Sequence, residues 1–585
     1  IEVENNVGWG VGDNLMQGKV LVHQNASAIA GVAMRGGEVV VRGSLGSRGG
    51  QVMKGGVLLA GGDAGFMAGY LMMGGILAIC GNAGDKLGQN IIAGSIYVGG
   101  KIASLGDDAE LVDPDESEIE KLYKLLDSYE IPAPKRFQRV CSSGKLHHYK
   151  TYEKAESGNG SKQRPRSLFV PKGPFWNRSM AEDIAAKATI GRYRVRGFGA
   201  QRLLPTLSDI GFRFAPEQLT ELKDVRSGCN LRTSLGGRFG GRPLDLAMPI
   251  LIAPMSFGAL SKNMKIALAK ASAKAGIAAN TGEGGMLPEE RQFADQLIYQ
   301  CLSGRFGFNP TDLQRADAVE IYISQGAKPG LGGQLMGKKI TAEIAELRGL
   351  PTGIDLRSPS RHPDVMGADD LVIKIHELRE ATGWGVPISL KLGAGRLKDD
   401  IKIALKDEVD FVQIDGMEGG TGASPDVVTE TVGIPTLAAI VQATKGLKEM
   451  DADGELPIVL MGGIRDGLDA AKAIALGATA VSMGTALLVA AGCTACRQCH
   501  SGICHKGIAA QDKKLVDRLD PDIAADWIAR FLEHTATEMA AITLAAGKTD
   551  IHDLSTADLV ALTTQAAEIT GLPLQEPSAA MAVRV

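Results

Sequence analysis

A short β-rich phrase recurs through the N-terminal part of the chain, and this periodicity limits the possible folds more than any other feature. The runs KVLV at 19–22, EVVV at 38–41 and VLLA at 57–60 each follow glycine, and the phrase returns every 18 to 20 residues. A period near 20 residues is typical of a solenoid, in which short strands with glycine corners stack and bury an apolar face on the next coil. We therefore expect residues 1–105 to form a glycine-rich, right-handed β-helix domain that acts as scaffold or interface.

Residues 106–200 carry two features expected of a connector. The acidic stretch 107–129 has the apolar spacing of a helix, with Leu122, Leu125 and Leu126 on one face. The segment SGNGSKQRPR at 157–166 is polar and rich in helix breakers, which is typical of a linker. We expect a helical connector and linker here.

Residues 201–515 alternate short apolar runs with helical stretches. An eighth strand is expected at 433–437, and the other seven runs are 249–254, 277–280, 319–324, 387–392, 411–415, 457–461 and 480–483. Such βα alternation over about 300 residues predicts an α/β fold, a (β/α)8 TIM barrel. Residues 516–585 are expected to form a helical C-terminal tail, with amphipathic stretches at 523–532, 537–546 and 556–569.

The composition excludes several classes of protein. Of 585 residues, 44% are hydrophobic and 22% charged, with a net charge of −4. These values are ordinary for a globular protein and indicate no basic surface for nucleic acid. The apolar runs are too short and too often broken by glycine to span a membrane. No signal peptide is visible, so we expect a cytoplasmic protein.

Four of the eight cysteines lie within the segment GCTACRQCHSGICHKG at 492–507. Three interpretations remain open from the spacing alone. The first is an iron–sulfur cluster, because cysteines two residues apart wrap such clusters. The second is a structural zinc site, which also uses C-x2-C pairs. The third is a pair of disulfides, which would need an oxidising compartment.

Polar and glycine residues gather where the predicted strands end, which is where a TIM barrel keeps its chemistry. Glycines after the last two strands let backbone amides approach a phosphate closely, so flavin mononucleotide (FMN) is the expected cofactor. Lys391 is expected to face the electron-rich N1–O2 edge of the flavin. The candidate cofactor-binding residues are Met255, Ser256, Gly258, Asn280, Gln325, Lys391, Asp415, Gly419, Gly420, Gly462, Gly463, Gly484 and Thr485.

Five phrases of the sequence carry a family resemblance. They are APMSFGALS at 253–261, NTGEGG at 280–285, GAKPGLGGQL at 326–335, DGMEGGTGASP at 415–425 and CRQCHSGICHKGIAAQD at 496–512. With these phrases the region 200–515 resembles the synthase domain of glutamate synthases, and the glycine repeat resembles the β-helix domain that accompanies it. The motifs are specific to that family.

The resemblance implies an FMN on the barrel and an iron–sulfur cluster beside it. Cys493, Cys499 and Cys504 reproduce the family's C-x5-C-x4-C pattern, which holds a [3Fe–4S] cluster. Cys496 is additional and is a possible fourth ligand, so [4Fe–4S] is the alternative and [3Fe–4S] is favoured.

The resemblance also implies roles for residues around the substrate. Lys328 and Gln334 look like ligands of 2-oxoglutarate, and Glu283 looks like the acid that links the flavin site to substrate and ammonia entry. Lys328 and Glu283 are thus the expected catalytic pair. Arg348 or Arg361 is a candidate for the distal carboxylate, because arginine binds carboxylates in a bidentate manner.

The implied activity is that of a synthase subunit, which aminates 2-oxoglutarate reductively through 2-iminoglutarate. No glutaminase domain or nicotinamide-binding domain is visible, and the chain starts with Ile1 where the family's amidotransferase has a catalytic cysteine. We therefore expect ammonia from glutamine through a separate glutaminase subunit. We also expect an external electron donor, either ferredoxin or an NAD(P)H-linked flavoprotein, in an oligomeric assembly.

Two departures from the family leave alternatives open. The repeat precedes the barrel, which indicates a split or rearranged type, and RSPSRHPD at 357–364 stands in place of the family's ISPPPHHD. One alternative is an N-methylglutamate synthase-type subunit that uses methylamine. The other is a non-catalytic electron-transfer or assembly subunit.

Overall fold

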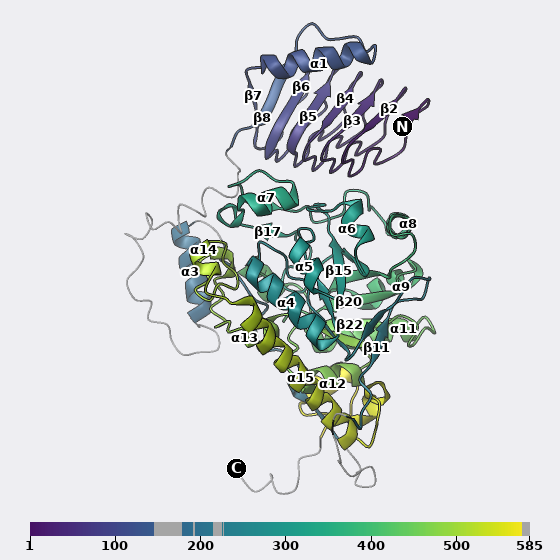
Figure 1. Ribbon diagram of the computed structural model, residues 1–585, viewed down its shortest axis with the longest axis vertical. Coiled ribbons are helices and arrows are strands. Elements are labelled where there is room, and N and C mark those ends of the chain that lie inside the picture. The colour runs from purple at the N-terminus through teal and green to yellow at the C-terminus, as the bar shows by residue number, and fades with distance from the viewer. Residues whose placement is uncertain (145–177, 191–192, 214–224, 226, 576–585) are drawn as a thin grey trace.

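The structure, a computed structural model, describes residues 1–144, 178–190, 193–213, 225 and 227–575. The predicted linker at 157–166 lies outside these residues. Figure 1 shows a stack of strands at one end of the molecule, a central barrel, and the long helix α15 (Pro521–Ala545) along the barrel's flank.

The N-terminal strands form a parallel sheet in chain order. They are β1 (Glu2–Val3), β2 (Lys19–Val22), β3 (Glu38–Val41), β4 (Val57–Ala60), β5 (Met73–Ile79) and β6 (Ala93–Val98). Val20, Val39, Leu58, Leu77 and Ile96 form one buried column, each paired with the residue 19 positions earlier or later. A second ladder of parallel bridges joins Val7, Ala26, Leu45, Ala64, Ala83 and Ile102.

The glycines of this repeat allow neighbouring coils to approach. A Cβ atom on Gly55 would lie 2.3 Å from the carbonyl oxygen of Arg35 in the preceding coil, and one on Gly74 would lie 2.4 Å from that of Lys54. Real Cβ atoms do not approach so closely, which explains why glycine recurs with the period of the coil.

The sheet continues past residue 105. Strands β7 (Ala109–Val112) and β8 (Gln138–Ser142) join it in antiparallel pairing beside β6. Between them, α1 (Glu116–Ser128) covers one face of the sheet (Figure 1), and its Leu122 and Leu126 pack on Leu59 and Tyr97. The predicted helix at 107–129 is therefore present, but shorter at its N-terminal end because β7 occupies 109–112.

Eight parallel strands form the barrel in the order β13-β23-β22-β20-β19-β16-β15-β14, and the terminal strands β13 and β14 contact one another. Their bounds are β13 (Ile250–Ile252), β14 (Ala278–Asn280), β15 (Gln296–Cys301), β16 (Ala318–Tyr322), β19 (Ile388–Gly393), β20 (Phe411–Asp415), β22 (Ile458–Met461) and β23 (Ala480–Met483). The sheet is thus nearly closed, and the seven predicted runs all correspond to strands.

The prediction of the eighth strand at 433–437 is wrong. Helix α11 (Thr436–Lys448) begins there, and the remaining strand is β15. The sequence QLIYQC of β15 carries two glutamines, which weakened its apolar pattern. Gln300 is nevertheless buried, because its amide donates to the carboxylate of Glu320 inside the barrel (Nε2 to Oε1 2.5 Å).

Helices surround the barrel and small hairpins complete it. The hairpin of β11 (Thr233–Leu235) and β12 (Leu244–Leu246) packs its leucines against Leu251 and Phe411 in the barrel interior. The longer helices are α4 (Lys262–Ala275), α8 (Ala368–Ala381), α9 (Leu397–Lys406), α12 (Gly467–Ala475) and α3 (Arg178–Ile190). The shorter ones are α5 (Pro288–Phe293), α6 (Pro310–Gln314), α7 (Ala342–Arg348), α10 (Asp426–Thr431), α13 (Thr485–Ala490), α14 (Lys513–Val516) and α16 (Thr564–Thr570).

The C-terminal tail differs from its prediction in two ways. The two amphipathic stretches at 523–532 and 537–546 form the single helix α15, which packs against α4 and α12. The stretch 556–569 is not one helix, because Leu559–Ala561 forms strand β24, paired with β10 (Ile210–Phe212). Within the described residues, no helix has both the length and the apolar run that crossing a membrane requires.

The strand stack docks on the barrel through an apolar cluster and polar contacts around it. From the repeat, Ile29, Val52 and Ile92 pack with Phe306 and Tyr322 of the barrel. Arg35 donates a hydrogen bond to the carbonyl of Arg305 at 3.1 Å, and Lys54 donates one to that of Gly304 at 3.0 Å. The repeat therefore holds the loop that follows β15, next to the ends of the barrel strands.

Candidate active site

One cavity of about 590 Å³ lies at the carboxyl ends of the barrel strands and extends to the cysteine segment. This volume is within the usual range for ligand sites. Of the residues predicted from the sequence, those that line it are Met255, Ser256, Glu283, Gln325, Lys328, Gln334, Arg348, Lys391, Asp415, Gly419, Gly420, Gly462, Gly463, Gly484, Thr485, Cys493, Cys496, Cys499 and Cys504. The structure thus gathers most of the predicted site around one space.

Three predicted residues lie outside this lining. Gly258 and Asn280 are not among the lining residues. The Asn280 side chain accepts a hydrogen bond from the Gly282 amide at 2.8 Å and so orders the 280–285 loop. Arg361 is exposed. The role of Arg361 as a ligand of the distal carboxylate stays a prediction, with no support from its position.

Buried side chains hold the loop 253–261, which forms one wall of the cavity, by its carbonyl groups. Lys265 donates to Met255 at 2.6 Å and Arg348 donates to Phe257 at 2.5 Å. Gln511 donates to Gly258 and Leu260 at 3.0 and 2.8 Å, and Lys339 donates to Ala259 at 2.9 Å. Five carbonyls of one loop therefore accept hydrogen bonds from four side chains, and three of these, Lys339, Arg348 and Gln511, lie 80 or more residues away in the chain.

Arg348 joins this loop to the 280–285 loop. Its Nη2 also donates to the carbonyl of Glu283 at 2.9 Å, and its guanidinium packs so closely on Gly284 that a Cβ there would lie 2.6 Å from Cζ. Burial lowers the pKa of Arg348 to about 10, and the charge of Glu283 opposes that shift. The Nη2 contacts indicate that Arg348 positions two loops, which differs from its predicted role as a substrate ligand.

Two lysines and two acids face each other at the cavity. Lys391 lies 3.8 Å from Asp415, which also accepts a hydrogen bond from the Gly326 amide at 3.0 Å. Burial raises the pKa of Asp415, while Lys391 and that amide lower it. Burial lowers the pKa of Lys328, with Glu283 raising it and Lys391 lowering it further. Among the described residues, the Lys328 ammonium has no hydrogen-bond or ion-pair partner, so it is available to an anionic ligand.

Glu283 is held beside the loop 326–335 by contacts that the sequence did not reveal. Its carboxylate packs on Gly333, where a Cβ would lie 1.9 Å from Oε1. Ser358, from the segment that departs from the family pattern, donates to Glu283 Oε1 at 3.4 Å, and its Oγ accepts a hydrogen bond from the Gly333 amide. Ser358 therefore positions both groups.

The cysteine segment presents its four thiols to the same cavity. All eight cysteines of the chain are free, so the disulfide interpretation is wrong for this structure. Among the described residues, no three cysteine Sγ atoms lie within 4.8 Å of one another.

The comparisons with known proteins agree with this geometry. A family model described as the conserved region in glutamate synthase matches residues 241–549. The chain belongs to the glutamate synthase family. This is a family of oxidoreductases, and the matched residues include every barrel strand, the cavity loops and the cysteine segment.

Individual relatives show how much of the chain is shared. The chain is 44% identical over 416 residues to a glutamate synthase large subunit-like protein of Rhizobium meliloti, covering 68% of this chain and 94% of the relative. It is 44% identical over 344 residues to an archaeal glutamate synthase (NADPH) of Methanocaldococcus jannaschii, covering 59% of this chain and 66% of the relative. A mandelate oxidase mutant with an FMN adduct aligns at a TM-score of 0.37 and 16% identity, covering 60% of this chain and 87% of that structure.

Several cavity residues of this glutamate synthase family member were missed in the sequence. The segment before the barrel contributes to the cavity because β9 (Val195–Arg196) pairs with β21 (Ser424–Pro425), which places Phe198–Gln201 in the lining. Ser482 and Glu418 also line it, and Ser482 Oγ and Glu418 Oε1 are buried without a partner among the described residues. Only the strand pattern of β23 hinted at Ser482; nothing in the sequence marked the segment before the barrel.

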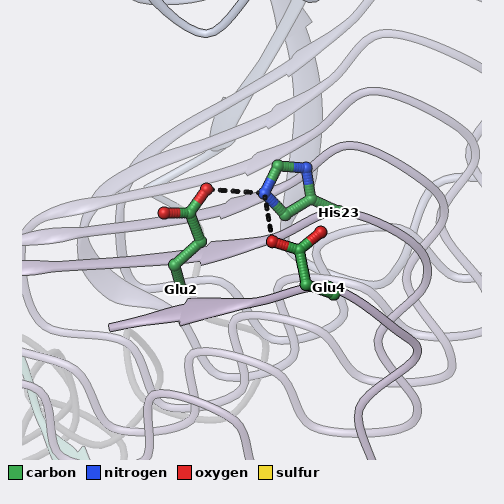
Figure 2. Close-up of side chains that lie close together, drawn as sticks. All are labelled: Glu2, Glu4 and His23. Atoms are coloured by element: carbon green, nitrogen blue, oxygen red, sulfur yellow. Dashed lines mark hydrogen bonds and ion pairs between the residues drawn. The ribbon is translucent and has the colours of Figure 1, made fainter.

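Two further features lie apart from this cavity or at its edge. A second cavity of about 350 Å³ shares Lys328 and Gln334 with the first and reaches Tyr70 and Asn90 of the repeat. Figure 2 shows Glu2, Glu4 and His23 at the first coil of the repeat, with His23 Nε2 2.7 Å from Glu2 and 3.9 Å from Glu4. Both glutamates of this group are exposed, and exposed pairs of this kind contribute little to stability.

Replacing Arg348 by methionine separates a positioning role from a ligand role. We expect Arg348→Met to lower the unfolding midpoint, because two buried hydrogen bonds to carbonyls are lost at about 1.5–3 kcal/mol each at most. The exposed Arg361→Met variant is the matched control and is expected to unfold like the parent chain. An unchanged unfolding midpoint in Arg348→Met, measured by calorimetry, would contradict the positioning role.

Proposed function

We propose that the chain is the synthase subunit of a glutamate synthase, which converts 2-oxoglutarate and ammonia into L-glutamate. The observation that carries the proposal is the single cavity that joins a cationic substrate loop, the glycine-lined strand ends and four cysteines. Condensation of ammonia with the keto acid releases water and forms 2-iminoglutarate, and two electrons with two protons then reduce the imine to the amine. The family membership and the similarity to the NADPH-named relative support this assignment.

The strand ends fit FMN. Gly462, Gly463 and Gly484 line the cavity, and the φ values of Gly462 and Gly463, 104° and 75°, lie in the region that glycine adopts readily. Ser482 Oγ and Glu418 Oε1 are buried polar atoms without partners among the described residues, and bound polar groups can satisfy them. Lys391 supplies a positive charge against a reduced, anionic ring. When bound, FMN supplies the two-electron reduction and the cluster supplies electrons one at a time.

The cysteine segment fits a [3Fe–4S] cluster held by Cys493, Cys499 and Cys504. These three side chains are half-buried at the cavity, whereas Cys496 is exposed. A cluster with an exposed fourth corner, [4Fe–4S], is the alternative. Thiolate-held iron is compatible with a reducing compartment, and we place the protein in the cytoplasm.

The chain's own residues bind the substrate and move its protons. Lys328 and Gln334 lie on the loop between β16 and β17 (Gln334–Leu335), and both line the cavity. The unpartnered Lys328 ammonium pairs with a carboxylate of 2-oxoglutarate, and Gln334 donates to the same anion. Glu283 accepts a proton from the attacking nitrogen. The ring of loops held by Lys265 and Arg348 fixes these groups relative to each other.

The partners and the architecture follow as parts of the same proposal. A separate glutaminase subunit delivers ammonia, and ferredoxin or an NAD(P)H-linked flavoprotein delivers electrons in an oligomeric complex. The N-terminal repeat is a right-handed β-helix, for which the two parallel ladders with a constant step of 19 residues are the support. The chain divides into the repeat at 1–105, the connector at 106–200, the barrel at 201–515 and the tail at 516–585, with β7 and β8 extending the repeat's sheet.

Anaerobic turnover tests the function directly. We expect the reduced chain, loaded with FMN and iron, to be reoxidised when 2-oxoglutarate and ammonium are added together, with L-glutamate formed in proportion. The flavin absorbance and the amino acid are measured in parallel, and each substrate alone is the control. Reoxidation with methylamine in place of ammonium would move the assignment to N-methylglutamate formation. A flavin that no amine reoxidises would contradict catalysis and leave an electron-transfer or assembly subunit.

The pH dependence of substrate binding tests Lys328. Its pKa is lowered from 10.5 because burial disfavours the ammonium. The ammonium form binds a carboxylate, so KM for 2-oxoglutarate should be constant below the lowered pKa and rise as the pH passes through it. We expect Lys328→Gln to raise KM about 10- to 100-fold at neutral pH, as loss of a charged hydrogen bond does, and to remove this alkaline rise. The exposed Lys338→Gln is the control; an alkaline rise that persists in Lys328→Gln belongs to another group.

Two cysteine variants distinguish the cluster types. We expect Cys496→Ser to keep the iron content and the EPR spectrum of a three-iron cluster, because this thiol is exposed and supernumerary. Cys499→Ser, which removes a half-buried ligand, should lose most of the iron. Iron per chain and EPR of the oxidised protein are the measurements. Loss of one iron per cluster in Cys496→Ser would instead indicate a [4Fe–4S] cluster with four cysteine ligands.

A further inference from the structure

Lys339 is a buried lysine at the junction of the substrate loop, the cavity wall and the cysteine segment. It ends the 3-10 helix η4 (Gly337–Lys339), which follows the proposed substrate ligand Gln334 by a few residues, and its side chain is 2% exposed. Its Nζ donates to the carbonyl of Ala259 at 2.9 Å and to that of Cys499 at 3.0 Å. The lysine therefore contacts the protein backbone at one of the proposed cluster ligands.

The stem of Lys339 also packs on the turn between two of these ligands. A Cβ on Gly502 would lie 3.2 Å from Lys339 Cγ. Gly502 has φ of 75°, the left-handed conformation that glycine adopts readily. The turn that leads from Cys499 to Cys504 is thus shaped around this side chain, and the ammonium is held on the protein side of the segment.

Bridging two carbonyls does not by itself require a charge. Gln511 makes equivalent contacts with a neutral amide. Its Nε2 donates to the carbonyls of Gly258 and Leu260, the residues on either side of Ala259. Burying an ammonium costs several kcal/mol unless an anion compensates it. Through its contact with the Cys499 carbonyl, the ammonium would lie beside the anionic cluster and its thiolates once the cluster is bound, and these groups would compensate the buried charge.

We propose that Lys339 is a positioning residue whose positive charge raises the reduction potential of the iron–sulfur cluster. The inference rests on the proposed function, because it requires the cluster to be bound by the cysteine segment. Reduction adds one electron to the cluster and its thiolates. A cation in the low-dielectric interior stabilises the more negative state, so the cluster accepts electrons more readily from the donor.

Three variants separate the charge from the hydrogen bonds. Lys339→Gln keeps a donor for the carbonyls and removes the charge, in the manner of Gln511. Lys339→Met removes both. Lys338→Gln removes the charge of the adjacent, exposed lysine and is the matched control. Each is prepared as the full chain with its cluster, and the midpoint potential is measured by anaerobic redox titration followed by EPR. Iron content and the thermal unfolding midpoint are recorded on the same samples.

We expect the cluster potential to shift to a more negative value in Lys339→Gln and in Lys339→Met, by a similar amount, with unchanged iron content in Lys339→Gln. Lys338→Gln should match the parent chain.

A parent-like potential in Lys339→Gln would overturn the proposal, and so would a shift confined to Lys339→Met, which would assign the effect to the hydrogen bonds. Loss of iron from a normally folded Lys339→Gln would also overturn it and make Lys339 a residue that only shapes the segment. Absence of an iron–sulfur signal in the parent chain would instead refute the proposed function, so the two failures are distinguishable.

Discussion

Hydrogen bonds from buried cationic side chains to loop carbonyls are the interaction on which the site depends. Lys265, Arg348 and Lys339 are each at most 2% exposed, and each donates to carbonyls of loops that border the cavity. Lys265 also pairs with the buried Glu290 at 2.7 Å and reaches the carbonyls of Asn280 and Thr281 at 3.0 Å each. Loops rich in glycine have little stiffness of their own, because glycine restricts the backbone least. Donors anchored on helices and on the loops that follow them supply the rigidity that the glycines lack.

The repeat contributes to the site by supporting it from outside. Its apolar residues Ile29, Val52 and Ile92 pack against Phe306 and Tyr322, and Tyr322 itself lines the cavity. Around this contact, Arg305 is fully buried and pairs with Asp364 at 2.6 Å, while Asp13 of the repeat lies 4.0 Å away. Burial raises the pKa of Asp13 whereas Arg305 and Lys374 lower it, and the two cations hold the pKa of Asp364 far below its usual value against the effect of burial. The scaffold is thus coupled to the catalytic end of the barrel by both apolar and ionic contacts.

Continuous apolar runs predicted strands correctly, whereas pairings between distant segments leave no local pattern in the sequence. Seven strands were located because each is a continuous apolar run, as buried parallel strands are. Strand β15 was missed because two of its residues are glutamines, and the burial of Gln300 depends on Glu320 from the neighbouring strand. The tail was predicted as helix throughout because local spacing cannot show that Leu559–Ala561 pairs with Ile210–Phe212, about 350 residues earlier in the chain. Arg348 was one of two candidates for the distal carboxylate because arginine binds carboxylates in a bidentate manner, and its guanidinium also contacts carbonyls of two loops.

The sequence by itself determined the class of fold and the family, and most of the site residues that it predicted line the cavity. Periodic apolar runs specify strands and coils locally, and the motifs at strand ends and the cysteine spacing are contiguous in the chain. Only the tertiary structure decided which buried cations hold the loops, that Phe198–Gln201 lines the cavity, and that Ser358 and Lys339 face Glu283 and Cys499. The Ser358–Glu283 contact joins residues 75 positions apart, and the Lys339–Cys499 contact joins residues 160 positions apart. Their partners are chosen by closure of the barrel and by the cost of leaving buried polar groups without hydrogen bonds, and neither condition is expressed in a local pattern.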